Sequence, residues 1–438
     1  MGKKEIIKKG ILLFGVISFL TLLIIPTPEG LGVDGKKASA VFLLCLSLWV
    51  TGYLPLAITS IMGIALIPLL GIMSPAETYA VFGNNAIFFI LGALMLASAL
   101  YKTGLGTRIA YKMINYYDDK PYKIIAGIII SSATLSCIMP EHAVAAMLFP
   151  IVFEIADSLD LKPLQSNFGK ALFLSLAWGA VIGGVTTFLG GARNILAVNI
   201  LQKNYDMSIG FFEWIKYSIP YSLTLLIIAY FLIIKFFTPE IDSVESAFYD
   251  LQEKIDEKGR LSTSEKRLMF VFIGVIFSWV FLSSYIDISV TAILGGVMIF
   301  VLKIIDWQDM EEYINWGVIL MYGGAIVVAT ALTDTGAAKW MADQVFSVVP
   351  LSPLIFILLF ALVTKLLTEG VSNVAAVAIV IPLAFSVGSV INLNPVAITL
   401  MIALPGGLAF CLPMGAPPNA IAFSSGYLNL AEVVKLGL

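Results

Sequence analysis

The sequence contains one histidine, His142, and an acidic residue, Glu141, directly precedes it. Both residues lie within a long apolar stretch, 122–158, that Pro140 interrupts. A carboxylate accepts hydrogen bonds and binds cations, whereas an imidazole titrates near neutral pH and can donate a hydrogen bond to an anion. Because titratable side chains are costly inside membrane-like segments, we interpret the two residues as part of a functional site.

Three roles are open for these two residues. Glu141 could cap the helix that follows while His142 packs, which is a structural role. Alternatively, His142 could hydrogen-bond an anion while Glu141 senses or carries a proton. In the third interpretation, His142 and Arg193 supply positive charge to the site, and Glu141 pairs with Arg193.

A second set of residues interrupts two apolar stretches in the C-terminal half, at Thr368 to Asn373 and at Met414 to Asn419. The N-terminus of a half-helix exposes unpaired N–H groups, which with an Asn amide can bind a carboxylate or sulfate oxygen. Unwound carbonyls together with Ser, Thr and Asn oxygens suit a dehydrated sodium ion. Ser372 and Asn373 could instead only cap the half-helix, and capping is compatible with binding.

The composition is that of a membrane protein, because apolar residues make up 59% and charged residues 13% of the chain. Soluble domains carry about 25% charged residues. A spanning helix needs about 20 mostly apolar residues. We therefore predict an all-α polytopic membrane protein with about 10–11 transmembrane helices. Clean apolar segments occupy 8–25, 38–54, 56–72, 84–102, 215–237, 266–285, 288–304 and 315–333, and interrupted ones occupy 122–158, 168–202, 353–390 and 396–429.

Enzymatic function is not expected. The sequence has no zinc-ligand pattern, phosphate-binding loop or dinucleotide fingerprint. No nucleophile stands at a spacing that suits Glu141 and His142. The net charge of −3 says little about partners, because the lipid bilayer is the expected main partner. We expect no nucleic-acid partner.

An internal repeat relates the two halves, because residues 99–104 resemble residues 331–336 at an offset of 232. Interrupted apolar segments at matching places in two halves point to a transporter binding site. The offset of 232 also places Ser136 on Thr368, Pro140 on Ser372 and Glu141 on Asn373, and an offset of 225 places Gly190 to Asn194 on Gly415 to Asn419.

Basic residues cluster in 3–9, 102–123 and 254–267, which predicts a cytoplasmic N-terminus. If 122–158 and 353–390 are re-entrant hairpins, the first enters from the cytoplasm and the second from outside, which makes an inverted-topology repeat. We expect interfacial helices at 105–119 and 336–349. The predicted domains are scaffold helices at 1–72, a first repeat at 73–237, a cytoplasmic linker at 238–265 and a second repeat at 266–438.

Ser372-Asn373 in a hairpin and the stretch Leu412 to Phe423 in a broken helix resemble the divalent anion/sodium symporters of the ion transporter superfamily. The resemblance covers nearly the whole chain. It implies a homodimer in the inner (plasma) membrane that transports a small divalent anion, such as succinate, malate, citrate or sulfate. It also implies an elevator mechanism, in which both hairpins and the broken helices 168–202 and 396–429 form the moving transport domain.

The resemblance further implies residue roles in the second repeat. A sodium site would lie at Thr368, Val371, Asn373 and Ala416. The substrate would contact Ser372, Asn373, Val374 and Pro417.

The sequence departs from the family pattern mainly in the first repeat. The family has Ser-Asn-Thr at each hairpin tip, but Pro140, Glu141 and His142 stand at the first tip, and Val374 replaces the threonine of the second. Arg193 stands where the second proline of the first broken helix is usual. We therefore expect the first sodium site to be replaced. Its degenerate positions are Ser136, Pro140, Glu141 and Gly190.

The resulting prediction is an anion transporter coupled to one sodium ion through the second repeat, with Glu141, His142 and Arg193 also contacting the substrate. A sodium-independent anion exchanger is an alternative, because a fixed charge at Arg193 cannot leave with the substrate. A remoter alternative is an ion or metalloid antiporter in which Glu141 binds a cation. In the family a last spanning helix begins near the position of Leu438, so the sequence is either truncated there or lacks that helix.

Overall fold

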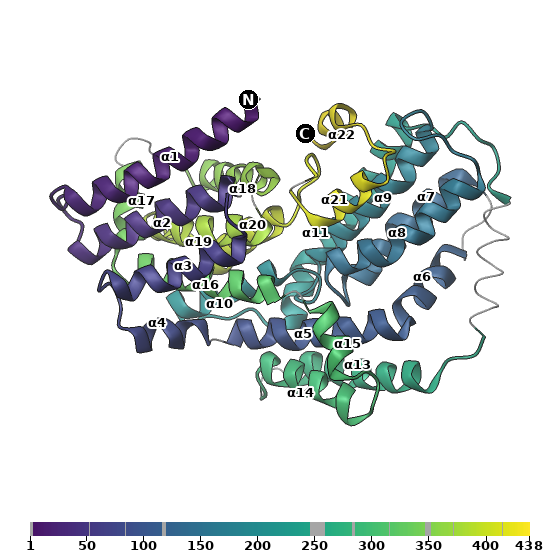
Figure 1. Cartoon of the computed structure of the whole chain (residues 1–438), viewed down its shortest axis with the longest axis horizontal. Coiled ribbons are helices and arrows are strands. Elements are labelled where there is room, and N and C mark those ends of the chain that lie inside the picture. The colour runs from purple at the N-terminus through teal and green to yellow at the C-terminus, as the bar shows by residue number, and fades with distance from the viewer. Residues whose placement is uncertain are drawn as a thin grey trace. The chain divides into compact units, whose positions relative to one another are not determined.

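The computed structural model describes residues 3–51, 53–83, 85–115, 120–245, 259–282, 285–314, 316–346, 352–370, 372–413 and 415–438. Its regular structure is entirely α-helical within these ranges (Figure 1). Contacts divide the chain into two compact units. Unit 1 comprises Met1–Phe88, Ile195–Ser208 and Asn315–Gly406, and unit 2 comprises Phe89–Asn194, Ile209–Ile314 and Gly407–Leu438.

Each clean apolar segment predicted from the sequence contains a helix. These are α1 Lys3–Ile24, α2 Val33–Thr51, α3 Leu56–Leu69, α5 Asn85–Thr103, α11 Phe211–Phe236, α13 Thr263–Phe281, α14 Ile288–Val301 and α16 Trp316–Asp334. In the described part of the chain, the helical stretches Pro75–Thr103 and Phe211–Phe236 are each long and apolar enough to cross a membrane, and shorter apolar helices accompany them.

The remaining helices surround the predicted interruptions. They are α4 Pro75–Phe82, α6 Leu105–Asn115, α7 Pro121–Ser136, α8 Glu141–Ser158, α9 Asn167–Gly184, α10 Ala192–Tyr205, α15 Trp307–Tyr313, α17 Ala337–Phe346, α18 Pro353–Gly370, α19 Asn373–Val390, α20 Pro395–Gly406, α21 Pro417–Ser424 and α22 Leu430–Gly437. Helices α6 and α17 lie where interfacial helices are predicted. The predicted linker falls partly outside the described residues.

Three of the four interruptions lie where the sequence places them, and the fourth begins earlier. Helix α20 ends at Gly406, whereas the prediction placed the interruption at 414–419. Pro405 removes a backbone donor near the end of α20, and two glycines follow it, so the helix is weakened at this point. Met414 lies outside the described residues. We call residues 185–191 the first break and residues 407–416 the second break.

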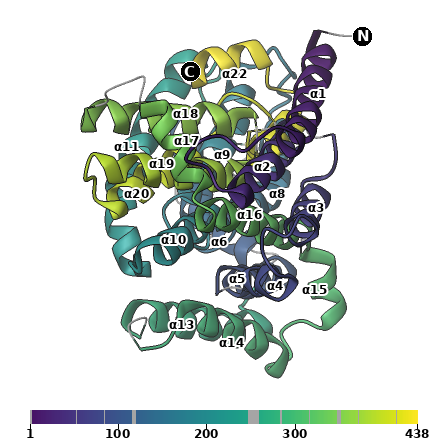
Figure 2. The same cartoon turned by 90° about the vertical axis from the view of Figure 1, so that its left-hand side faces the viewer.

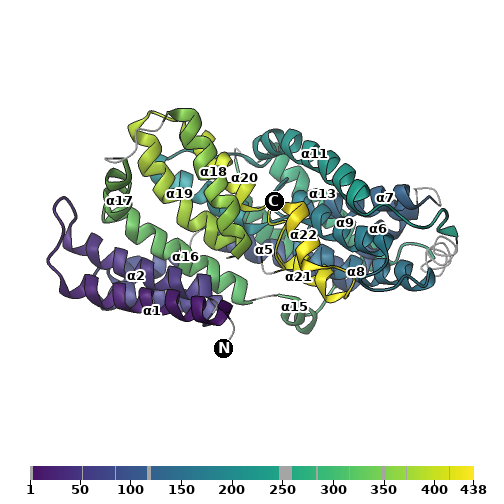
Figure 3. The ribbon, with the colours of Figure 1, turned by 90° about the horizontal axis from the view of Figure 1, so that it is seen from above.

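The same three-helix arrangement occurs once in each unit. In unit 2 the hairpin of α7 and α8 packs on α9, and in unit 1 the hairpin of α18 and α19 packs on α20 (Figure 3). Unit 1 also packs α16 against α2 and α3, with α1 along α2 (Figure 2). Unit 2 packs α11 against α9, and α21 against α8 and α9. Each hairpin is therefore held by the first half of a broken helix.

Helices α7 and α9 approach so closely that Gly183 has no room for a side chain. A methyl group on Gly183 would lie 2.2 Å from the carbonyl oxygen of Ala133. We expect Gly183→Ala to lower the thermal unfolding midpoint of the detergent-purified protein by several degrees, because one of two helix backbones must shift. The matched control is Gly274→Ala in α13, where nothing lies within 4 Å of the added methyl group. Equal midpoints for the two variants would contradict the packing described here.

Candidate functional site

The end of the first hairpin is bonded to the first break. Helix α7 ends at Ser136 and α8 begins at Glu141, and we call residues 137–140 between them the first tip. The Glu141 amide donates to the carbonyl of Gly190 at 3.0 Å. The Thr187 hydroxyl donates to the carbonyl of Cys137 at 2.7 Å. Backbone groups that the hairpin and the broken helix leave unpaired are thus satisfied by each other.

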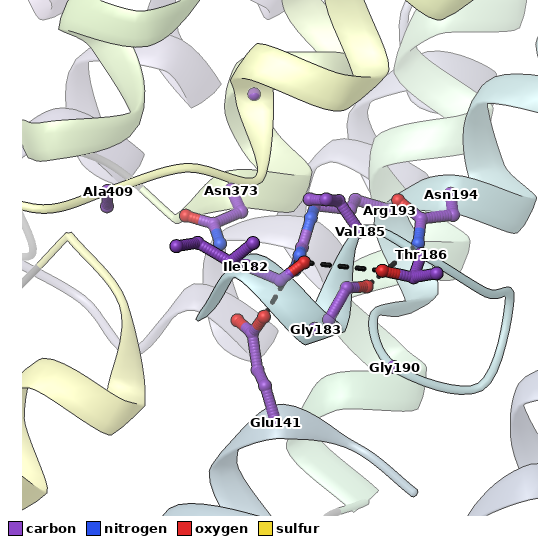
Figure 4. Close-up of polar contacts among 12 residues, drawn as sticks. Glu141, Ile182, Gly183, Val185, Thr186, Gly190, Arg193, Asn194, Asn373 and Ala409 are labelled. Atoms are coloured by element: carbon purple, nitrogen blue, oxygen red, sulfur yellow. Dashed lines mark hydrogen bonds and ion pairs between the residues drawn. The ribbon is translucent and has the colours of Figure 1, made fainter. Parts of the chain in front are cut away.

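Glu141 and Arg193 form a buried ion pair between the first hairpin and the start of α10 (Figure 4). Arg193 Nη2 lies 2.9 Å from Glu141 Oε2, and the two side chains are only 3% and 5% exposed. The pairing that the third interpretation requires is therefore present. Arg193 Nε is buried and has no hydrogen-bond partner within the described ranges.

Glycines surround this ion pair, and they leave no room for larger side chains. A methyl group on Gly184 would lie 2.2 Å from Glu141 Oε2, and one on Gly407 would lie 2.2 Å from Arg193 Nε. The guanidinium group therefore rests against the backbone of the second break, all within unit 2. The ion pair consequently touches the first hairpin and both breaks.

His142 is half-buried beside Glu141, in the first turn of α8. Its ring has no hydrogen bond to any residue that the structure describes. A half-buried imidazole without a partner could bond a ligand. Contact between His142 and an anion stays a prediction.

Equivalent asparagines bridge the two breaks with the same hydrogen bonds. Asn194 Nδ2 donates to the carbonyls of Gly184 at 3.0 Å and Thr187 at 2.7 Å. Asn419 Nδ2 donates to the carbonyls of Ala409 at 2.9 Å and Leu412 at 3.2 Å. All three matched positions differ by 225 residues, which is the offset found in the sequence. The agreement in geometry supports a structural repeat at the breaks.

Tryptophans provide a second match between the breaks. The indole N–H of Trp214 donates to the Val185 carbonyl at 3.0 Å, and that of Trp178 donates to the Phe410 carbonyl at 3.2 Å. Val185 and Phe410 are also 225 residues apart. Because unwound carbonyls at membrane depth need partners, a tryptophan beside each break stabilises it.

An aromatic cluster anchors the first break. Phe188 is 1% exposed, and its ring lies within 6.2 Å, centroid to centroid, of the rings of Phe89, Phe211 and Trp214. Contacts among buried aromatic rings hold an irregular segment in place and do not depend on hydrogen bonds. The Arg193 and Asn194 side chains are therefore attached to a rigid support.

The second hairpin carries an oxygen cluster in unit 1. Thr368 Oγ1 lies 2.7 Å from Asn373 Oδ1 and 2.7 Å from the carbonyl oxygen of Gly406. Thr368 and Asn373 are 0% and 5% exposed. Hydroxyl, amide and carbonyl oxygens of this kind can ligate sodium. The structure brings together two predicted sodium-site residues, Thr368 and Asn373, and adds the Gly406 carbonyl, which sequence reasoning missed.

Other predicted residues of the second repeat are placed as follows. Ser372 caps α19, because its hydroxyl accepts from the Ala375 amide at 3.2 Å. Val374 is 7% exposed. Ala416 caps α21 and Pro417 is its first residue, and both belong to unit 2. Val371 lies outside the described residues.

The equivalent positions of the first repeat differ from this oxygen cluster. The Ser136 hydroxyl, equivalent to Thr368, is buried and has no hydrogen-bond partner in the described ranges. Glu141, equivalent to Asn373, pairs with Arg193, which is equivalent to Pro418. Glu141 and Arg193, which both differ in type from their equivalents in the second repeat, therefore bind each other.

The family model described as the sodium:sulfate symporter transmembrane region matches residues 6–438. The chain belongs to this family. It is accordingly a multi-pass membrane transporter and not an enzyme, as the sequence predicts. It is similar to the sodium-dependent dicarboxylate transporters SdcS of Staphylococcus saprophyticus, 27% identical over 97% of this chain and 87% of the relative, and of Staphylococcus aureus, 28% identical with the same coverage.

The buried ion pair generates a double-mutant prediction. We expect Glu141→Gln and Arg193→Met each to lower the free energy of unfolding by about 3–5 kcal/mol, because each leaves one buried charge unpaired. The double variant should lose less than the sum of the two. Denaturant unfolding in detergent measures all three.

The control for this cycle is the exposed pair of Lys162 and Asp160, whose side chains are 62% and 86% exposed. Removing either charge there should leave the unfolding midpoint unchanged. Additive losses at Glu141 and Arg193 would show that the two charges do not stabilise each other.

The matched asparagines generate a second prediction. Asn194→Ala and Asn419→Ala should each lower stability by about 2 kcal/mol or more, because two carbonyls lose their donor in each case. The control Asn429→Ala removes only an exposed cap of α22. Thermal unfolding midpoints that fall for one break variant but not for the other would contradict equivalent roles.

Proposed function

We propose that this protein is a secondary active transporter of small divalent anions, either dicarboxylates or sulfate, coupled to one sodium ion. The family description and the names of the relatives support the substrate class and the use of sodium. We further propose an elevator mechanism, inverted repeats with re-entrant hairpins, a homodimeric assembly and a cytoplasmic N-terminus.

The observation that carries the single-sodium proposal is the buried ion pair of Glu141 and Arg193. The guanidinium group is permanently charged, and it lies among the positions of the degenerate first sodium site. A sodium ion there would have to displace this guanidinium group from the Glu141 carboxylate, which it already neutralises at 2.9 Å in a medium of low dielectric constant. Arg193 thus replaces the first sodium ion with a charge that cannot dissociate.

The second sodium site has no such obstacle in our proposal. The oxygens of Thr368, Asn373 and Gly406 already converge within unit 1. They supply neutral ligands, which suit a monovalent cation that must be released in each cycle. We propose that Val371 and Ala416 complete this site and that Ser372, Asn373, Val374 and Pro417 contact the anion.

Substrate contact in the first repeat is assigned to His142 in particular. Glu141 and Arg193 are almost fully buried and hold each other, so their contribution to the anion is electrostatic. His142 is half-buried next to them and stands where the family has a threonine donor. Its ring N–H can donate a hydrogen bond to the anion, as the hydroxyl group of that threonine can.

Sodium-coupled transport is favoured over obligatory exchange by the charge balance of the ion pair. If Arg193 were unpaired, the empty carrier would bear a positive charge through the membrane, and its return would be unfavourable. Glu141 cancels this charge at 2.9 Å. Its pairing with Arg193 also disfavours the antiporter alternative, in which Glu141 would bind a cation.

The test is uptake and counterflow of labelled succinate, citrate and sulfate in proteoliposomes, with sodium or potassium. We expect sodium to stimulate uptake with a Hill coefficient of about 1, because one ion is bound. Thr368→Val should abolish this stimulation. The matched control is Thr364→Val, one turn earlier in α18, whose hydroxyl bonds to the Phe360 carbonyl of its own helix.

Two outcomes would overturn parts of the proposal. Equal counterflow with and without sodium would establish exchange instead of symport. A Hill coefficient near 2 would mean that the first site still binds sodium despite Arg193. If none of the three anions moves, the proposed substrate class is wrong.

A further inference from the structure

Unit 1 contains a cavity that none of the residues at the end of the second hairpin lines. Its volume is about 430 Å³, and α4, α10 and α16 supply most of its wall. The size lies within the range of small-molecule sites. Several lining residues carry amide or ammonium groups, namely Asn85, Asn199, Gln202, Lys203 and Asn204.

The charge of this cavity is positive. Lys203 lines it, and none of the described residues in its wall is acidic. The Lys203 ammonium donates to Thr330 Oγ1 at 2.8 Å, and Thr330 is also part of the wall. An ammonium group has three donors, so the bond to Thr330 leaves it able to bond a ligand as well.

Asp334 is the acidic neighbour of Lys203, and it binds the ammonium weakly. Its carboxylate lies 3.6 Å from Lys203 Nζ, and the two side chains are 50% and 40% exposed. This distance exceeds that of a charge-assisted hydrogen bond, about 2.7–2.9 Å. The ion pair of Lys102 with Asp309 in unit 2 is much shorter, at 2.5 Å. Asp334 therefore leaves the Lys203 ammonium able to bind a ligand.

The amide groups of the wall are held in position. Asn199 Nδ2 donates to the Ile195 carbonyl at 2.9 Å, and Asn204 Nδ2 donates to the Ile200 carbonyl at 2.7 Å. Each amide nitrogen has two hydrogens, so each can donate a second bond. The rest of the wall is largely apolar, which suits the carbon skeleton of a small organic anion. Ordered amides beside an ammonium group suit a carboxylate.

We propose that this cavity is a second binding site for a small carboxylate anion, with Lys203 as its charged anchor. None of the hairpin residues assigned to the transport site lines it. The identity of the anion rests on the proposed function, because the transported dicarboxylate is the candidate ligand. Asp334 competes with that ligand for the Lys203 ammonium.

The two residues should therefore have opposite effects on affinity. Lys203→Gln should weaken binding at this site by about tenfold or more, because a charged donor is lost. Asp334→Asn should strengthen it by about two- to fivefold, because an exposed competing carboxylate is removed. A merely structural ion pair would instead give loss of stability in both variants and no opposite change in affinity.

The experiment is titration calorimetry of the purified full-length protein with succinate, at fixed sodium concentration. Two sites are expected for the original protein and one for Lys203→Gln, with unchanged counterflow of saturating substrate. Thr330→Val, which frees the ammonium from its hydroxyl partner, should change the affinity of the second site alone. The control is Lys162→Gln, an exposed lysine that is also paired with an aspartate.

The results separate this proposal from the proposed function. Succinate counterflow together with a single binding site that neither Lys203→Gln nor Asp334→Asn alters would overturn the second site and leave the transport function standing. A shift of affinity in the same direction in both variants would also overturn it. Absence of counterflow for every anion, with opposite shifts in succinate binding, would leave the cavity site standing and refute the transport function.

Discussion

The structure of unit 2 depends on one buried ion pair, that of Glu141 with Arg193. Removing two charges from water is expensive, and only close pairing repays the cost. Glu141 is the first residue of α8 and Arg193 the second of α10, so their pairing fixes the first tip against the first break. The guanidinium group also lies against Gly407, the first residue of the second break.

The two breaks are stabilised by the same framework of hydrogen bonds, but the hairpin residues at equivalent positions differ in charge. Asn194 and Asn419 bridge the same pairs of carbonyls, and Trp214 and Trp178 bond equivalent carbonyls. These bonds keep irregular backbone satisfied where lipid could not. These bonds do not involve Glu141 or Arg193, so equivalent breaks accompany neutral oxygens at the second hairpin and an ion pair at the first.

Much of this architecture could be predicted from the sequence, because its signals are local. The helix starts at Glu141 and Asn373 follow from a proline or a capping serine before an apolar run. The pairing of Glu141 with Arg193 was one of three interpretations, and the spacing alone could not select it. The Gly406 carbonyl beside Thr368 and the Lys203 cavity depend on how distant helices approach, and no local pattern encodes that approach.

An internal ion pair and a bound sodium ion have different thermodynamic consequences for the proposed transporter. A bound sodium adds the free energy of its gradient to the cycle, but its site empties when sodium is scarce. The Glu141–Arg193 pair is always occupied and adds no driving force. With one sodium ion per divalent anion, uptake moves one net negative charge inward, which opposes it by about 2.3 kcal/mol per 100 mV of inside-negative potential. With the ion pair in place of a sodium ion, the proposed transporter can build up a smaller substrate gradient. Its first site, however, is complete at any sodium concentration.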